Sequence, residues 1–212
     1  MPRRPERQPE YSASEIKMRA REKNVEIYRR LTGLYCIPED KQYWTLCHLQ
    51  PPVPGSEIIQ LESMGFLKKS QFYGVDWDKK KEDIILQNQQ WHPDAHWIEG
   101  EWTRVLTRTT TFNPALVFLD ITRFADKKRT ADVVVPTMYK CPLRTVLIVN
   151  LLLSNPRGKQ RFNPDKLVEY LCTKVGSLEL KHWLTNVERF WYNAFGRTDM
   201  ITFVFYKKGA QA

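Results

Sequence analysis

Two apolar runs of the sequence end in an aspartate, and a third is followed closely by a glutamate. Residues 72–75 (FYGV) precede Asp76, residues 116–119 (LVFL) precede Asp120, and Glu101 stands two residues after the strand-like end at Glu99. A carboxylate at the carboxyl end of a buried parallel strand keeps free lone pairs, so Asp76 would be able to accept both hydroxyls of a vicinal diol. These acids are the first candidates for a functional site.

The sequence gives weaker evidence for a nuclease, an ATPase or a zinc site. Asp76, Asp78 and Asp120 together would suit Mg²⁺ in a nuclease, but the Gly-x-x-x-x-Gly-Lys-Ser/Thr loop of an ATPase is absent. Cysteines occur four times, with no CxxC pair and no histidine at zinc-ligand spacing. We therefore expect reduced, mostly buried thiols in a cytoplasmic protein, and we assign no metal site.

The elements that must position the acids alternate along the chain. Helices are expected near residues 15–31, 56–66 and 84–86 and from Pro164 onward. Five strands are expected at residues 43–47, 71–76, 95–99, 115–120 and 146–153, and two aromatic runs, 190–195 and 200–206, form a hairpin. This order predicts an α/β fold, namely a mostly parallel seven-stranded sheet flanked by helices, with a C-terminal antiparallel hairpin strand at one edge.

The 212 residues suffice for one compact domain plus a short extension. We divide the chain into a basic N-terminal arm and helix, residues 1–32, and an α/β domain, residues 33–212. The periodicity of the helix turns Ile16, Val25 and Tyr28 inward and leaves Lys17 and Arg21 outside. A membrane span is not expected, because the longest apolar stretch has only about eight residues against the roughly 20 that a spanning helix needs.

Three segments resemble motifs of the class I, S-adenosylmethionine-dependent methyltransferases, and the order of elements is similar from about residue 43 to residue 208. They are FYGVDWD at 72–78, WIEGEW at 97–102 and LVFLD at 116–120. The resemblance implies that Asp76 binds the ribose hydroxyls of the cofactor and that Trp77 flanks its adenine. It also implies that Glu101 faces the adenine amino group beside Trp102, and that Asp120 is a catalytic residue near the methyl donor and the substrate.

The sequence departs from the family at the first strand. In place of a Gly-x-Gly turn it has three prolines, Pro51, Pro52 and Pro54, followed by Gly55. Proline lacks an amide donor and stiffens a loop, so this segment would either shape a different pocket or close the cofactor site. His48 and Gly55 are the candidate cofactor-site residues in this segment. The residues after Asp120, ITRF, also differ from the Asn/Asp-Pro-Pro-Tyr motif of amino-methylating enzymes.

The formal net charge of +9 favours anionic partners. Basic residues follow the expected strand ends, where ligands bind in parallel sheets, and would neutralise phosphates. They are Lys79, Lys80, Arg123, Lys127, Lys128, Arg129, Arg157, Lys159 and Arg161. We therefore expect a methyltransferase that acts on RNA or DNA with S-adenosylmethionine. The alternative is an inactive methyltransferase-like subunit that binds nucleic acid in a nucleoprotein complex, with the N-terminal basic helix available to a protein partner.

Overall fold

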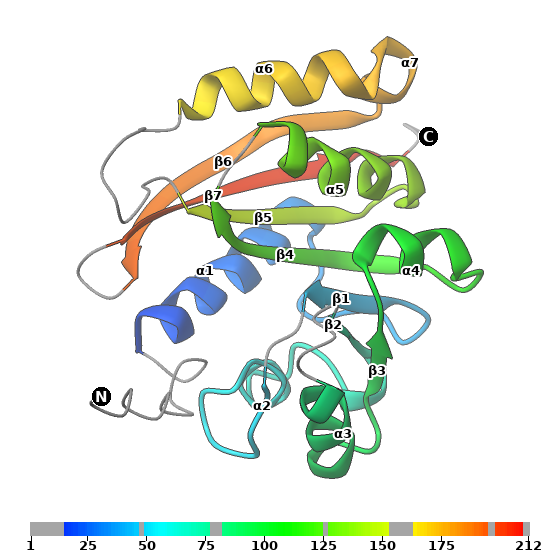
Figure 1. The fold of residues 1–212 in the computed structure, drawn as a ribbon, viewed down its shortest axis with the longest axis vertical. Coiled ribbons are helices and arrows are strands. Elements are labelled where there is room, and N and C mark those ends of the chain that lie inside the picture. The colour runs from blue at the N-terminus through cyan, green and yellow to red at the C-terminus, as the bar shows by residue number, and fades with distance from the viewer. Residues whose placement is uncertain are drawn as a thin grey trace, which may run out of the picture.

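A seven-stranded sheet forms the centre of the molecule (Figure 1). The computed structural model describes residues 15–46, 49–76, 82–124, 127–152, 163–194 and 198–209. The strand order is β3-β2-β1-β4-β5-β7-β6. The strands are β1 (Gln42–Leu46), β2 (Phe72–Asp76), β3 (His96–Glu99), β4 (Pro114–Phe124), β5 (Val146–Leu152), β6 (Trp183–Ala194) and β7 (Thr198–Lys207).

The antiparallel strand lies inside the sheet and not at its edge, so that part of the expectation was wrong. β7 pairs antiparallel with β5 on one side and with β6 on the other. β6 therefore runs parallel to β5 and forms the outer edge. After β5 the chain does not form the strand next to β5. It first forms β6 at the edge of the sheet, and the hairpin then places β7 between β5 and β6. The predicted α/β class, the mostly parallel sheet and the hairpin are confirmed.

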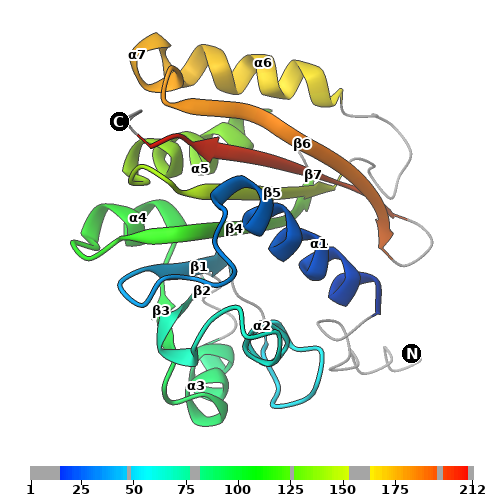
Figure 2. The same ribbon diagram turned by 180° about the vertical axis from the view of Figure 1, so that it is seen from behind.

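Helices cover both faces of the sheet, as Figures 1 and 2 show from opposite sides. One face packs against α1, α2 and α3, and the other against α4, α5, α6 and α7, so the two faces hold separate apolar clusters. The bounds are α1 (Glu15–Thr32), α2 (Glu57–Ser63), α3 (Glu82–Trp91), α4 (Trp102–Arg108), α5 (Lys127–Lys140), α6 (Pro164–Val175) and α7 (Ser177–Leu180), with a 3-10 turn at Lys69–Gln71.

Trp44 of β1 is the centre of an aromatic group in the core. Its side chain is fully buried and stacks on Tyr73 of β2, with ring centroids 4.7 Å apart. Phe112 and Trp102 meet it edge-on at 4.9 and 6.3 Å. Offset and edge-on contacts of this kind stabilise a core beyond the area that they bury. They hold β1, β2 and the start of α4 in fixed relative positions.

The N-terminal helix α1 packs directly on the sheet. Val25, Ile27 and Tyr28 are buried in the cluster between α1 and the sheet. The face chosen from periodicity was partly wrong, because Arg21 is only 7% exposed whereas Ile16 is 42% exposed. α1 therefore packs in the same apolar cluster as residues of the sheet.

Salt bridges also tie α1 to the edge strand β6. Glu188 of β6 pairs with Arg30 and, at 3.5 Å, with Lys23. Lys23 also lies 5.3 Å above the ring of Phe190. The outward side of α1 carries Glu22 and Glu26 as well as basic residues, so it presents mixed charge.

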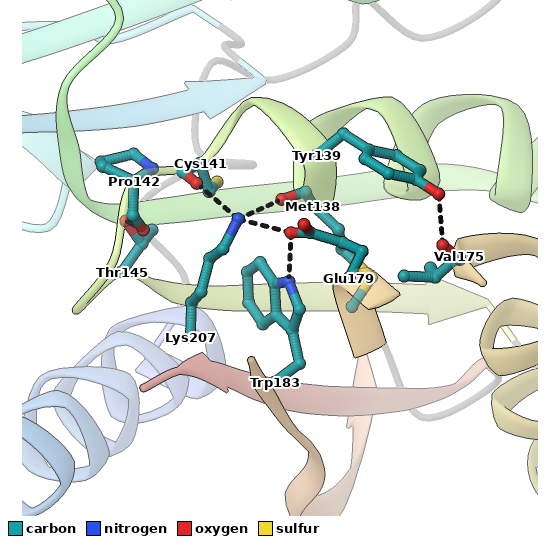
Figure 3. A network of polar contacts seen from close by, with 9 residues as sticks. All are labelled: Met138, Tyr139, Cys141, Pro142, Thr145, Val175, Glu179, Trp183 and Lys207. Atoms are coloured by element: carbon teal, nitrogen blue, oxygen red, sulfur yellow. Dashed lines mark hydrogen bonds and ion pairs between the residues drawn. The ribbon is translucent and has the colours of Figure 1, made fainter. Parts of the chain in front are cut away.

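A buried lysine joins the last strand to the helices on the other face (Figure 3). Lys207 of β7 donates to the carbonyl oxygens of Cys141, at 2.8 Å, and Met138, at 3.3 Å, and pairs with Glu179 of α7. Glu179 also accepts from Trp183 Nε1 at 3.1 Å. Burial raises the pKa of the Cys141 thiol. The network therefore links β7, the end of α5, α7 and β6 through one ammonium group.

Two of the three described cysteines have little exposure, in line with the expectation of mostly buried thiols. Cys141 is buried and Cys172 is half-buried, but Cys36 is exposed. Within the described ranges, no helix combines the length and the apolar character that crossing a bilayer would require.

Replacing Lys207 by methionine is expected to lower the free energy of unfolding by about 3–5 kcal/mol, because Glu179 loses its cation while largely buried. Lys68→Met is the control, since it breaks the exposed Lys68–Glu39 pair and should have a much smaller effect. Urea denaturation followed by circular dichroism measures both. Equal losses in the two variants would show that the buried network contributes no more than a surface pair.

Candidate active site

The register of three parallel strands brings Asp76 and Asp120 to the same level of the sheet. Leu46, the last residue of β1, pairs with Val75 of β2, and Thr45 pairs with Phe118 of β4. Each aspartate therefore lies one residue beyond the level of Leu46. β2 and β4 flank β1, so their main chains are about 10 Å apart at this level. Two carboxylates thus face one region at the carboxyl edge.

Asp76 ends β2 and is 6% exposed. Its carbonyl oxygen accepts from Gly100 N at 2.8 Å, which fixes the turn after β3 against β2. Gly100 has φ +147, and a Cβ there would lie 3.1 Å from Val105, so a side chain would crowd this turn. Glu99 pairs with Asp76 in the strand register and is exposed. The position of Asp76 suits a carboxylate that accepts hydrogen bonds from a diol.

Asp120 lies on the face of β4 that α1 covers. Its Oδ2 is 3.8 Å from Lys17 Nζ of α1, and the two side chains are only 11% and 13% exposed. Its Oδ1 is buried and has no hydrogen-bond partner among the described residues. Burial lowers the pKa of Lys17, and the charge of Asp120 opposes that effect. The pair is therefore a partly desolvated ion pair with one acceptor oxygen left over.

A row of polar side chains continues from Asp120 across the sheet. Asp120 is in register with Asn150 of β5, and Asn150 with Thr202 of β7. The Thr202 hydroxyl donates to Asn150 Oδ1 at 2.5 Å. A small cavity of about 10 Å³, close to the size of one water molecule, lies nearby between α1 and the sheet, with Arg21, Asn24 and Tyr43 among its lining residues.

The loop after β1 is held by Arg21 and by Gln50. Arg21 Nη1 donates to the carbonyl oxygen of Gly55 at 2.6 Å and to Gln60 Oε1 at 3.2 Å. Gly55 has φ +96, a conformation that glycine adopts without strain. Gln50 Oε1 accepts from Glu57 N, and the Gln50 carbonyl oxygen accepts from His92 Nε2, since a carbonyl cannot donate. The proline-rich loop is thus anchored at both ends.

Glu57 begins α2 and contacts Tyr43, near the start of β1. Tyr43 donates its hydroxyl hydrogen to the Glu57 carboxylate. Burial, followed by the nearby charge of Glu57, raises the pKa of Tyr43. Burial also lowers the pKa of His92. Glu57 and His92 both bond to Gln50, so they hold this end of the loop in place.

The structure describes two of the residues predicted to contact adenine, Trp102 and Glu101. Trp102 is 3% exposed in the core, where its Nε1 donates to Thr137 Oγ1 at 2.7 Å. Its indole is enclosed by protein, so the structure gives it a packing role instead. Glu101 stands at the N-cap of α4, exposed and 3.2 Å from Arg104. Trp77 and His48 lie outside the described residues.

Of the nine basic residues expected at the carboxyl edge, two have described side chains. Lys128 and Arg129 are exposed in the first turn of α5, which follows β4. Arg123 lies in β4 and Lys127 begins α5, but their side chains are outside the described part. The remaining five, together with Asp78 of the nuclease alternative, also fall outside it; these five are Lys79, Lys80, Arg157, Lys159 and Arg161.

Sequence reasoning missed the part of the site that α1 contributes. Lys17, Arg21 and Asn24 recur at three- and four-residue spacing, so they share one side of the helix. Their polar character suggested an outward face. Turning these three residues inward leaves Ile16 exposed, as the structure shows. Helical periodicity alone does not decide between the two orientations of the helix.

No protein-family model matches this sequence, and no protein of curated function matches it at a significant level. Solved structures do match it. An assigned sarcosine dimethylglycine methyltransferase from Galdieria sulphuraria has a TM-score of 0.55 at 7% identity, over 89% of this chain and 86% of that one. An assigned O-methyltransferase from Klebsiella pneumoniae gives 0.54 at 13%, over 90% and 80%. An assigned rRNA methylase from Clostridium thermocellum gives 0.52 at 10%, over 87% and 96%.

Identities this low show the fold alone. The chain therefore has the class I, Rossmann-like fold of the S-adenosylmethionine-dependent methyltransferases, which its sequence motifs had predicted.

Proposed function

We propose that this protein is an S-adenosylmethionine-dependent methyltransferase whose acceptor is RNA or DNA. The observation that carries the proposal is the placement of Asp76 and Asp120 at one level of the sheet, on the two strands that flank β1. Asp76 ends β2, whereas Asp120 lies within β4, which continues to Phe124. Ligands of open parallel sheets bind beyond the carboxyl ends of the strands. A separation of about 10 Å allows one carboxylate to hold a nucleoside while the other faces the reacting atoms.

The described residues fit the cofactor at its ribose. Asp76 is a buried carboxylate at a strand end, and the vicinal diol of a ribose supplies two donors to such a group. When bound, S-adenosylmethionine supplies an electrophilic methyl group. Asp76 would fix the nucleoside, and the enclosed surroundings of Asp120 would keep bulk water from the acceptor. Methyl transfer to a good nucleophile depends mainly on alignment, which rigid strands provide.

The proline-rich loop sets a limit on how the cofactor would bind. Three of the residues between Gln50 and Gly55 are prolines and have no amide donor. The part of the cofactor beyond the ribose would therefore depend on side chains in place of a glycine-rich backbone turn. A cofactor-free scaffold is the alternative that this loop favours, and cofactor binding decides between the two.

The acceptor class rests on charge. The chain carries a formal net charge of +9, and Lys128 and Arg129 are exposed at the start of α5, directly after the strand that holds Asp120. Cations there would contact the phosphates of a polymer whose base or sugar reaches Asp120.

Calorimetry with S-adenosylhomocysteine tests the cofactor assignment. Wild-type protein should bind it, and Asp76→Ala should weaken binding by at least about tenfold, because hydrogen bonds to a charged group contribute about 1.5–3 kcal/mol. Glu99→Gln is the matched control, since Glu99 is the exposed neighbour of Asp76 on β3. No binding by the wild type, or equal binding by all three proteins, would contradict the assignment.

Nucleic-acid binding should depend on the start of α5. The double substitution Lys128→Glu and Arg129→Glu is expected to weaken RNA or DNA binding and to reduce its salt dependence. Lys140→Glu with Lys181→Glu is the charge-matched control, because Lys140 is exposed at the opposite end of α5. Fluorescence anisotropy with single-stranded oligonucleotides at several salt concentrations measures both. If the two double variants bind alike, only net charge matters and the proposed surface is wrong.

A further inference from the structure

A lysine of the N-terminal helix α1 reaches Asp120 of the candidate site. Lys17 lies in the first turns of α1, and its Nζ is 3.8 Å from Asp120 Oδ2. The side chain is 13% exposed. Burying an ammonium group costs free energy, and a position near the start of a surface helix would otherwise allow it to extend into water. The burial of Lys17 therefore calls for an explanation beyond packing.

We propose that Lys17 is a positioning residue for Asp120, holding Oδ2 so that Oδ1 faces a methyl acceptor that must lose a proton, namely a hydroxyl or amino group. This inference rests on the proposed function. It adds the chemical class of the accepting atom and a role for the N-terminal helix.

The geometry assigns different tasks to the two oxygens of Asp120. Oδ2 faces the ammonium of Lys17, whereas Oδ1 is buried and without a hydrogen-bond partner among the described residues. A buried carboxylate oxygen normally accepts a hydrogen bond. A bound O–H or N–H group would supply that missing donor.

The proton balance defines the acceptor. As the acceptor oxygen or nitrogen forms its bond to the methyl carbon, the carbon–sulfur bond breaks and sulfur retains the electron pair. The acceptor then carries a surplus proton, which moves to Asp120 Oδ1, and the neutral carboxylic acid later releases it to water. An acceptor without such a proton would not need Oδ1.

Burial lowers the pKa of Lys17, and the surrounding charges act on it in both directions. Asp120 of β4 and Glu57 of α2 raise its pKa, whereas Arg21, one turn along α1, lowers it. Burial is the largest influence and brings the pKa of Lys17 below its usual value. Lys17 should therefore lose its proton, and with it the hold on Asp120, at a lower pH than a surface lysine does.

The test compares K17M, K17R and the control K23M, since Lys23 lies on α1 but pairs with Glu188 at the edge strand. Tritiated methyl transfer to single-stranded RNA and DNA gives kcat and KM against pH, and calorimetry gives the affinity for S-adenosylhomocysteine. K17M should lower kcat by about 100-fold with cofactor affinity unchanged. Wild type should lose activity on the alkaline side, whereas K17R should keep activity there, because a guanidinium stays charged.

A second readout does not depend on catalysis. Reductive methylation with ¹³C-formaldehyde allows the pKa of Lys17 to be followed by NMR, and it should fall in D120N because the opposing charge is removed. Wild-type protein that does not bind S-adenosylhomocysteine overturns the proposed function as a whole. Normal cofactor binding with K17M as active as K23M, or with the same Lys17 pKa in D120N and wild type, overturns only this inference.

Discussion

The parallel register of β2, β1 and β4 is the constraint on which the rest of the site depends. Because Leu46 pairs with Val75 and Thr45 with Phe118, the next row of side chains holds both Asp76 and Asp120. A slip of one residue would turn either carboxylate to the opposite face of the sheet. The aromatic group around Trp44 opposes such a slip, since its rings pack across β1, β2 and the start of α4.

The face covered by α1 changes character along the strands. Leu116 and Phe118 of β4 pack in an apolar cluster, and the next residue on that face is Asp120. α1 matches this change, with Val25 and Tyr28 over the apolar part and Lys17 over the aspartate. The same helix thus contributes hydrophobic burial at one end and opposite charge at the other. Its position couples folding of the N-terminal segment to the electrostatics of the site.

Much of the fold was predictable because β1, β2, β4 and β5 each contain a short apolar run. The sequence pointed to Asp76 and Asp120 as candidates because each acid directly follows such a run. The position of β7 was not predictable, because a hairpin signal does not say on which side its second strand pairs. Lys17 and Arg21 were assigned to solvent for a related reason, since their partners, Asp120 and the Gly55 carbonyl, are over 30 residues away in sequence. The burial of Trp102 was not predictable either, because a tryptophan beside a motif acid does not reveal how deeply its ring is buried.

The proposed function requires a nucleoside at Asp76 and the reacting sulfur near Asp120. The most direct measurement is a crystal structure of the protein with S-adenosylhomocysteine. Both ribose hydroxyls should lie within hydrogen-bond distance of the Asp76 carboxylate, with the sulfur on the side of β1 that faces Asp120. A ligand bound elsewhere, or a proline-rich loop that fills the space beside Asp76, would contradict it.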